Sequence, residues 1–448
     1  MGTSKTKSEP RILVTGMTSL RSGAMESDNL GNFVIIEPLF RSLREEFPVS
    51  KIQTTLQLSD QFAAESKVEV LRSESFFEYD WRTSAGIVWQ LIVLLLWRAM
   101  LALKIDLGFI LAGSARLKAL LANDLIVDFS GDMFGDNSLN QHHFLAGAAT
   151  PVLASLLKKK VVSVASSPGP FSSKFSASLA KFSLGRFDLV AVREPASLQL
   201  LHDAGFAGGK FQVFPCFSFG FQPSGALADA VLSENEPRLY SSSRPLTGII
   251  LSNLNMMSPP PSKWPRQDEE YEPFVQLATH LVREKKSRVC LLSHRNKISK
   301  GGYPSMGSDH SIITRVMELL PDDVREHAFM IDNIYDAATM NKVIGCFDIL
   351  VSGRIHGAVQ GIMQCIPTLV INYGMEPKAH KLKGFTLLCD LNDYFSEPDD
   401  TDQLKNSLDR LWQKSGYITA NLKTRVPNLV QQSHEVWERV RHVYERGP

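Results

Sequence analysis

Short apolar runs that end in glycine or a polar residue recur along the chain, and they limit its fold more than any other feature. The first run, at 11–16, reads RILVTG, which is typical of a buried parallel strand that delivers a loop at its carboxyl end. Segments with helical spacing separate the runs, as in strand–helix–strand crossovers. Later runs of a first series lie at 124–131, 161–167, 188–194 and 211–216, and those of a second series at 246–255, 287–294, 327–332, 348–353 and 367–374.

The two series are separated by residues 222–245, which are rich in Pro, Ser, Glu and Ala and indicate a linker between domains. We therefore expect an α/β protein with two Rossmann-like lobes, each an open parallel sheet, and a ligand cleft between the lobes at the carboxyl ends of the strands. The predicted parts are a disordered leader (1–10), an N-terminal lobe (11–222), a linker (223–245), a C-terminal lobe (246–401) and helices that pack across the lobes (402–448).

Composition excludes several classes of protein. The 448 residues are 44% hydrophobic, which is enough for two cored domains. Lys and Arg total 48 against 47 Asp and Glu, so the whole chain has no field that would draw it to nucleic acid, and any anion site has to be local. Five cysteines without a CxxC pair indicate neither a zinc site nor a disulfide framework, and a reducing cytoplasm fits best. We expect no metal and no cofactor.

Residues 86–103 form the most apolar stretch of the chain. Gln90 and Arg98 interrupt it, which makes it a poor membrane span, and we expect a buried core helix. The alternative uses Trp89 and Trp97 together with the basic residues that follow, because such a helix suits a membrane interface. The protein would then be peripheral at the membrane. Gly2 and Thr6 also satisfy the loose pattern for N-myristoylation, although we expect a disordered leader there.

Reactive side chains are densest at 351–378. Arg354, His356 and Gly357 fall where an apolar strand turns into a helix, so backbone N–H groups and side chains can converge on an anion. The Arg354 fork can hold a carboxylate or phosphate, and a histidine such as His356 can transfer a proton near pH 7. The alternative is a helix-capping arginine and a core histidine. No GxGxxG after a strand, GxxxxGK[ST] or HExxH motif occurs in the sequence.

The ordered set of motifs resembles the polysaccharide pyruvyltransferase family. Its C-terminal signature, Arg-x-His-Gly, a small apolar helix, a Pro-led strand and a downstream Lys, is matched by Arg354, His356, Gly357, Pro367 and Lys378. Further landmarks in the family's order are RILVTG, NLGN from Asn29, DLIVDFSGD from Asp124, SSPGPF from Ser166, AVREPAS from Ala191 and LLSH from Leu291.

Two motifs depart from the family pattern. The turn after the strand that begins near Asp124 reads FSGD where the family commonly has a Gly-rich turn. The usual Asn-x-Gly-Asp near the first helix reads Asn29-Leu30-Gly31-Asn32. Both departures concern the side that would bind the acceptor.

The resemblance implies a fold similar to the glycosyltransferase B type and a transfer of the enolpyruvyl group of phosphoenolpyruvate to sugar hydroxyls as a pyruvate ketal, with release of phosphate. Arg193 and Arg354 would hold the donor, with His356 as general acid and later base. An ion pair with Glu194 or Asp188 is the alternative for Arg193. The implied donor-binding residues also include Gly357, His294 and Lys378.

The acceptor would be a glycan, a glycolipid or a nucleotide-linked sugar in exopolysaccharide or cell-wall assembly. Its implied contacts are Asn29, Asp132, Asp136, His142 and His143, although loop carboxylates are commonly turn formers. Second-line candidates for the site are Arg295, Lys297, Asp309 and His310.

Two other functions and the oligomeric state stay open at this point. A nucleotide-sugar glycosyltransferase of the same architecture could use an Arg and His cleft for a diphosphate. A catalytically lapsed glycan-binding homologue would bind its ligand without turnover. A homo-oligomer is compatible with the sequence.

Overall fold

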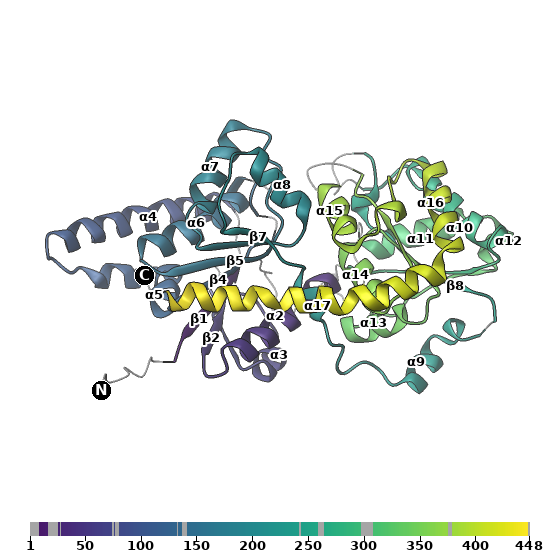
Figure 1. Ribbon diagram of the computed structural model, residues 1–448, viewed down its shortest axis with the longest axis horizontal. Helices are drawn as coiled ribbons and strands as arrows, with labels where there is room; N and C mark the ends of the chain where they lie inside the picture. The colour runs from purple at the N-terminus through teal and green to yellow at the C-terminus, as the bar shows by residue number, and fades with distance from the viewer. Residues whose placement is uncertain are drawn as a thin grey trace. The chain divides into compact units, whose positions relative to one another are not determined.

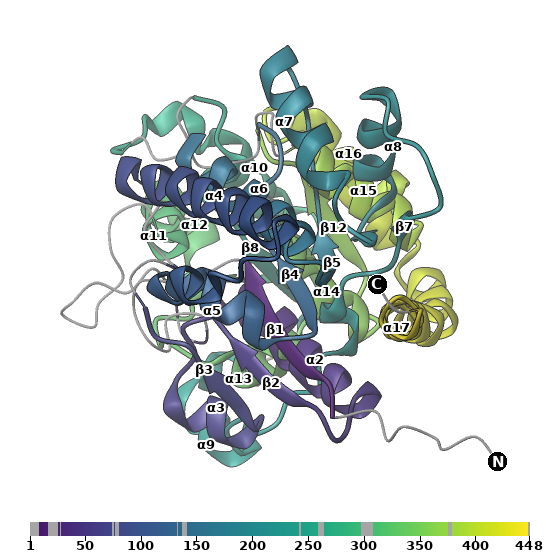
Figure 2. The same cartoon turned by 90° about the vertical axis from the view of Figure 1, so that its left-hand side faces the viewer.

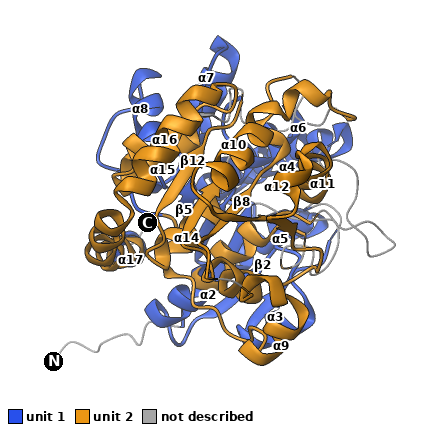
Figure 3. Cartoon of the chain, turned by 90° about the vertical axis from the view of Figure 1, so that its right-hand side faces the viewer, with its two compact units in different colours: residues 1–25, 39–215, 434–448 blue, residues 26–38, 216–433 orange. Residues whose placement is uncertain are grey.

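The computed structural model describes residues 9–16, 26, 28–73, 76, 80–131, 133–136, 141–241, 243–258, 264–296, 308–374 and 379–446. These residues form two compact units, shown in Figures 1 and 3. Unit 1 comprises 1–25, 39–215 and 434–448, and unit 2 comprises 26–38 and 216–433. Two helices contribute to both units: α2 (Leu30–Glu46) and α17 (Ser415–Glu445).

Unit 1 is built on a seven-stranded sheet, parallel throughout, in the order β3-β2-β1-β4-β5-β6-β7. The order reverses between β1 and β4, which is the switch point of a doubly wound sheet. Its strands are β1 (Arg11–Gly16), β2 (Lys51–Thr54), β3 (Val68–Val70), β4 (Leu125–Phe129), β5 (Lys160–Ser166), β6 (Leu189–Val192) and β7 (Phe211–Val213). Its other helices are α3 (Asp60–Glu65), α4 (Trp81–Ala102), the 3-10 helix η2 (Gly108–Gly113), α5 (Ala115–Ala122), α6 (Gln141–Leu156), α7 (Lys174–Leu184) and α8 (Pro195–Asp203).

Unit 2 repeats this plan with six parallel strands in the order β10-β9-β8-β11-β12-β13, so its switch point lies between β8 and β11. Its strands are β8 (Leu246–Ile250), β9 (Arg288–Leu292), β10 (Ala328–Met330), β11 (Ile349–Ser352), β12 (Thr368–Ile371) and β13 (Phe395–Ser396). Its helices are α9 (Asp229–Asn235), α10 (Glu272–Arg283), α11 (Asp309–Leu319), α12 (Asp322–Arg325), α13 (Ala337–Ile344), α14 (Ile355–Met363), α15 (Ala379–Cys389) and α16 (Thr401–Gln413). The 3-10 turns of unit 2 are η3 (Phe217–Gly220), η4 (Pro237–Leu239), η5 (Asn253–Asn255), η6 (Asp268–Glu270) and η7 (Asn392–Tyr394).

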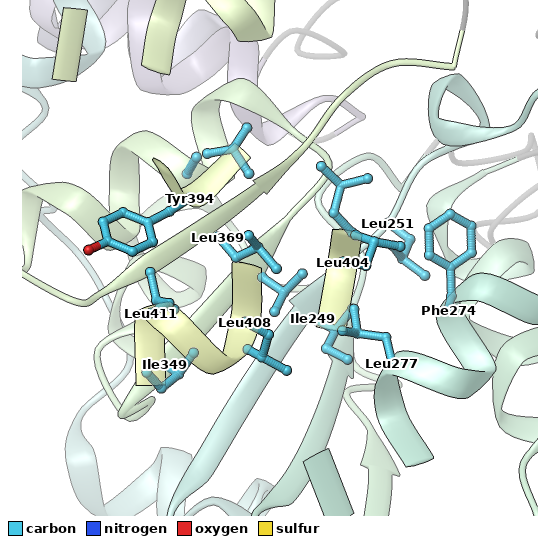
Figure 4. Close-up of a cluster of buried hydrophobic side chains, with 14 of the residues drawn as sticks. Ile249, Leu251, Phe274, Leu277, Ile349, Leu369, Tyr394, Leu404, Leu408 and Leu411 are labelled. Carbon is cyan, nitrogen blue, oxygen red and sulfur yellow. The ribbon is translucent and has the colours of Figure 1, made fainter. Parts of the chain in front are cut away.

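Alternate residues of the unit 2 strands enter two separate cores, as the period of two requires. Ile249 and Ile349 belong to the core that includes α10 and α16, which Figure 4 shows. Ile250 and Leu350 belong to the core on the other face. Both faces are apolar, which explains the uninterrupted hydrophobic runs in the sequence. Each fully buried Leu or Ile stabilises the fold by about 1.5–3 kcal/mol.

The two sheets agree with the predicted fold class, but the boundaries between the parts differ from the predicted ones. Residues 26–38 lie in unit 2 although they come early in the chain, because Leu30 and Val34 of α2 join a unit 2 core. The stretch 223–245 is also part of unit 2, because Leu232 and Leu239 are buried in the same core. α16 lies in unit 2, and α17 passes from unit 2 to unit 1 at His434. The expected leader lies outside the described residues up to residue 8.

The expectation that residues 86–103 form a core helix is wrong. Residues 86–102 belong to α4, whose only buried side chains are Ile87 and Leu94. The reason is that α6 already covers the sheet: nearly all α6 side chains from His143 to Ala154 are buried, and α4 packs against α6. Figures 1 and 2 show α4 beside α6. Hydropathy predicts an apolar helix, but it does not say whether each face of the helix has a protein partner.

Candidate active site

The candidate active site lies at the switch point of unit 2. β8 and β11 are adjacent there, and the loops at their carboxyl ends lead in opposite directions. The loop after β8 contains Ser252 and η5, and the loop after β11 contains Gly353 and Arg354. Arg354 is the residue before the first turn of α14, where backbone N–H groups of the helix have no intrahelical partner. The predicted residues Arg354, His356 and Gly357 therefore occupy the position at which such sheets bind ligands.

Arg354 forms a buried ion pair with Asp309. Its Nε donates to Asp309 Oδ2 at 3.0 Å, and its Nη2 donates to Asp309 Oδ1. Burial lowers the pKa of Arg354, but the charge of Asp309 and these hydrogen bonds outweigh burial and leave the pKa above its ordinary value. Arg354 is thus held as a cation in a fixed orientation. Its Nη1 makes no hydrogen bond with any residue of the described chain.

Asp309 holds more than one element in place. Besides Arg354, its Oδ2 accepts the backbone N–H of His294 at 3.3 Å and that of Arg295 at 2.8 Å. Asp309 is the first residue of α11, whose N-cap Ser308 accepts the N–H of Ser311. A single carboxylate therefore ties the loop after β9 and the start of α11 to the guanidinium after β11.

Arg295 adds a second guanidinium to the site. Burial is the main cause that lowers its pKa, followed by the positive charge of Arg354, whereas Asp309 and Asp28 act in the opposite direction. The Arg295 side chain makes no hydrogen bond or ion pair within the described residues. Two guanidiniums that repel each other therefore lie close together, balanced by the charges of Asp309 and Asp28. Because the Arg295 guanidinium makes no hydrogen bond within the described residues, it can hydrogen-bond an anionic ligand.

Residues early in the chain complete this region. Asn29 forms an antiparallel bridge with Arg295, and the N–H of Asn296 donates to the carbonyl of Asp28 at 2.8 Å. The sequence assigned Asn29 to acceptor binding in the N-terminal lobe. The structure places it in unit 2, beside the residues expected to bind the donor.

His356 lies in the first turn of α14 and packs against the first turn of α2. A Cβ atom added to Gly31 would lie 2.7 Å from His356 Nδ1 and 3.2 Å from His356 Cβ. Glycine at position 31 is what lets the imidazole approach the α2 backbone this closely. The NLGN motif and the RIHG motif, far apart in sequence, therefore meet at one histidine.

Asn255 fixes the turn that carries Arg354. Its Oδ1 accepts the N–H of Ser252 at 2.9 Å and its Nδ2 donates to the carbonyl of Asn372 at 2.8 Å, so it links the loops after β8 and β12. Any side chain at Gly353 would collide with Asn255. Sequence reasoning missed Asn255, although Ser252 and Asn255 form a capping box that was readable as such.

His294 is buried, and its surroundings indicate a structural role. Its Nε2 lies 2.8 Å from Gln360 Oε1, and Gln360 Nε2 donates to the carbonyl of Ala337, so His294 carries its proton on Nε2. Burial lowers the pKa of His294 to about 4, and the nearby charge of Arg354 acts in the same direction. A neutral imidazole enclosed in this way does not attract an anionic donor.

Gly357 serves helix packing. A Cβ there would lie 2.7 Å from Ile250 Cδ1 and 3.0 Å from Ser352 Oγ, so glycine lets the start of α14 approach β8 and β11. Its contribution to a ligand site is made by the backbone position. Lys378, the fifth predicted donor contact, and Lys297 lie outside the described residues. His310 follows Asp309 in α11 and is half-buried.

The remaining predicted residues lie in unit 1. Arg193, just after β6, donates from Nε to Ser167 Oγ at 2.6 Å and lies 3.6 Å from Glu194, which is one of the ion pairs weighed as the alternative. Asp136 accepts the N–H of Ser172 at 2.6 Å and so connects two loops, as a turn-forming carboxylate does. His142 shares a hydrogen bond of 2.7 Å with Ser84 of α4, His143 is buried in α6, and Asp132 lies outside the described residues.

The switch point of unit 1 has a different chemistry. Thr15, Asp128 and Ser163 are neighbours across β1, β4 and β5, and Thr15 also contacts Thr55. Asp128 is fully buried; the N–H of Ser130 donates to its Oδ1, and its Oδ2 has no partner among the described residues. Burial raises the pKa of Asp128 to about 7. A small cavity beside this row is lined by Thr15, Gly16, Phe76, Arg116, Ser130, Met133, Ala146, Gly147 and Thr150.

These features define a two-lobed α/β protein with two neighbouring arginines at the switch point of one lobe. The fold is similar to that of a glycosyltransferase from Rickettsia africae ESF-5 (TM-score 0.57, 11% identity, 97% of this chain and 99% of that chain). It is also similar to Anabaena Alr3699/HepE in complex with UDP and glucose (0.56, 12%, 96% and 99%) and to UDP-GlcNAc 2-epimerase from Neisseria meningitidis bound to UDP-GlcNAc (0.57, 9%, 96% and 99%). At these identities the likeness shows the fold, which is of the glycosyltransferase B type.

The sequence itself places the chain more narrowly. The polysaccharide pyruvyl transferase family matches residues 29–375, which is well over half of the chain, and the chain belongs to that family. The matched range starts at Asn29 and ends just after Tyr373, so it includes Arg295, Asp309, Arg354 and His356. Among curated protein sequences, none matches this chain.

Proposed function

We propose that the protein transfers the enolpyruvyl group of phosphoenolpyruvate to two hydroxyls of a glycan as a pyruvate ketal. The observation that carries the proposal is the pair of neighbouring guanidiniums of Arg354 and Arg295, together with His356 in the first turn of α14. Phosphoenolpyruvate has a carboxylate and a phosphate on adjacent positions, and two guanidiniums with the N–H groups of a helix start suit both.

His356 supplies the proton in this proposal. Protonation of the methylene carbon turns it into a methyl group and leaves a cationic centre at the carbon that carries the phosphate oxygen. One sugar hydroxyl attacks that carbon and loses its proton, inorganic phosphate then departs, and a second hydroxyl closes the ketal. One hydroxyl proton replaces the proton given to the methylene carbon, and the other leaves with phosphate. A histidine can act as acid in the first step and as base in the last.

The acceptor is proposed to bind through unit 1. The row of hydroxyls at Thr15, Thr55 and Ser163 around Asp128 supports this, because hydroxyls and a carboxyl are the groups that hydrogen-bond sugars. A glycan, a glycolipid or a nucleotide-linked sugar would each offer such hydroxyls. Cell-surface or exopolysaccharide assembly in the cytoplasm is the setting that we propose, with no resident cofactor.

The test is to mix the protein with phosphoenolpyruvate and a panel of acceptor glycosides, following phosphate release and the mass of the product. We expect turnover in the wild type and a loss of about 100-fold or more in His356→Ala, the size typical of a lost general acid. His202→Ala, an exposed histidine on α8, is the matched control and should keep full activity. Equal activity in both variants would remove His356 from the mechanism.

A nucleotide-sugar glycosyltransferase is the second candidate. The likeness of the fold to HepE in complex with UDP and glucose favours it, because the same cations could hold a diphosphate. Binding of UDP-glucose together with the absence of phosphoenolpyruvate binding would favour this candidate over the first. Binding of phosphoenolpyruvate without turnover of any acceptor would instead indicate a lapsed homologue.

A further inference from the structure

The outward face of α4 is apolar along its whole length. At 100° per residue, positions 81, 85, 88, 89, 92, 95, 96 and 99 fall on one arc of about 120°. They are Trp, Ala, Val, Trp, Ile, Leu, Leu and Ala, and each is exposed. Trp89 has 65% of its surface exposed. By length and composition, α4 is also the helix among the described residues that could cross a membrane.

A helix on the surface of a domain ordinarily turns a polar face to water. α16 of unit 2 does so: Leu404, Leu408 and Leu411 are buried, and most of its other residues are polar. In α4 the buried stripe consists of Ile87 and Leu94, and the opposite side is as apolar as that stripe. The composition of α4 therefore matches a helix that has a second apolar environment on its outer side.

The apolar surface continues past the end of α4. Leu103, Ile105 and Phe109 are exposed on the segment that leads back toward α5, and Phe109 is 75% exposed. Figure 1 shows α4 extending beyond the sheet of unit 1, with the return segment beside it. We call residues 81–122 the α4 hairpin.

The α4 hairpin is positively charged. It contains Arg82, Arg98, Lys104, Arg116 and Lys118 against a single acidic residue, Asp106, whereas the whole chain has a net charge of only +1. Basic residues around an apolar face, with tryptophans among them, are what a helix needs to bind the surface of an anionic bilayer.

The packing of α4 indicates a helix that lies on a bilayer and does not cross it. Arg98 Nη1 donates to the carbonyl of Leu156 in α6 at 2.7 Å, and Ser84 shares a hydrogen bond with His142 at the start of α6. These contacts hold α4 along the protein over most of its length. The return segment includes α5, which has only eight residues, carries Arg116 and Lys118, and packs against α6 and β1.

We infer that the α4 hairpin is a membrane-docking surface that lies in the interface of a bilayer containing anionic phospholipids. The apolar arc enters the boundary between headgroups and acyl chains, and the exposed Arg82, Lys104 and Lys118 meet the lipid phosphates. This inference is independent of the proposed chemistry, because it concerns neither unit 2 nor the donor.

The test is cosedimentation of the full chain with phosphatidylcholine vesicles, with and without phosphatidylglycerol. We expect binding to the anionic vesicles, weaker binding to the neutral ones, and a decline with salt because the charges are screened. The tryptophan emission should shift to the blue on binding, since Trp81 and Trp89 leave water. A wild-type protein that stays in the supernatant with anionic vesicles at low salt would overturn the inference.

The variant for this test is Ile92→Glu/Leu96→Glu, with both changes on the exposed arc. It should bind anionic vesicles about tenfold more weakly or worse, because two charges enter the apolar face. Its matched control is Val49→Glu/Val231→Glu, which adds the same charge at exposed apolar positions elsewhere and should bind almost as the wild type does.

Two further measurements keep the outcome clear. Far-UV circular dichroism should be the same for both double variants, and the milder Trp89→Ala replaces the α4 variant if it does not fold. Light scattering in the absence of vesicles tests whether a second copy of the chain covers the α4 surface instead. The result that would contradict docking to lipid has two parts: the wild type is a dimer that Ile92→Glu/Leu96→Glu converts to a monomer, and both proteins bind vesicles equally.

Discussion

The switch points of the two units occupy equivalent places in two similar sheets, yet they hold opposite chemistry. At the switch point between β8 and β11, unit 2 holds Arg354 and Arg295 beside the carboxylate of Asp309, and His356 follows in the first turn of α14. Between β1 and β4, unit 1 gathers hydroxyls and the carboxyl of Asp128, which burial keeps largely protonated up to about pH 7. The fold supplies the same position twice, and the side chains make one suited to an anion and the other to neutral polar groups.

The largest loss of folding stability should follow from replacing Asp309, the carboxylate beside Arg354 at the switch point of unit 2. Asp309→Asn leaves Arg354 buried without its counter-charge, which typically costs about 3–5 kcal/mol of folding free energy. Urea titration would measure the change. Asp322→Asn is the control, because Asp322 pairs with Arg325 in solvent and its loss should cost less than about 1 kcal/mol. Equal effects in the two variants would show that the Arg354–Asp309 pair does not hold unit 2 together.

At the other switch point, Asp128→Asn should change how stability depends on pH. The folded pKa of Asp128 is raised to about 7, so the folded state binds more protons than the unfolded state between about pH 4 and 7. The wild type should therefore lose up to about 4 kcal/mol as the pH rises through this window, and the neutral amide removes that loss.

The measurement is the free energy of unfolding of both proteins from pH 5 to pH 8. The advantage of Asp128→Asn over the wild type should grow up to about pH 7 and level off above it. A constant difference across the series would mean that Asp128 ionises normally and that the contrast between the switch points is smaller than we describe.

A smaller effect, on activity alone, should follow from Gly31→Ala. The added Cβ would meet the His356 ring at 2.7 Å and displace it, so we expect turnover to fall about tenfold. Stability should change by less than about 1 kcal/mol, because the helix preference of Ala over Gly opposes the cost of displacing His356. Gly416→Ala is the control, since nothing lies within 4 Å of its added Cβ. Unchanged turnover in Gly31→Ala would show that the position of His356 is not critical.

Much of the fold could be predicted because buried parallel strands appear in the sequence as short apolar runs. The strands that the sequence did not indicate are short or mostly polar: β2 (KIQT), β3 (VEV) and the two-residue β13. The division of α2 between the units could not be predicted, since it depends on which core Leu30 and Val34 enter. The exposure of α4 was missed for the same reason, because burial depends on partners elsewhere in the chain.

The candidate site was predictable where its chemistry is local. Arg354 and His356 stand two residues apart at a strand end, which a sequence displays directly. The environment of His294 depends on Gln360, which lies 66 residues away, and that of His356 depends on Gly31 near the other end of the chain. Asp309 and Arg295 were only second-line candidates, because their roles follow from contacts between β9, α11 and α14 that no short motif contains.

Calorimetric titration with phosphoenolpyruvate would show whether the switch point of unit 2 binds an anion. We expect the wild type to bind phosphoenolpyruvate and Arg295→Ala to bind it at least about tenfold more weakly, the loss expected for one charge-assisted contact. Asp128→Asn should bind it as tightly as the wild type does. If the wild type does not bind phosphoenolpyruvate, the unit 2 switch point is not its site. If Arg295→Ala binds it as tightly as the wild type and Asp128→Asn binds it more weakly, the site lies in unit 1 instead.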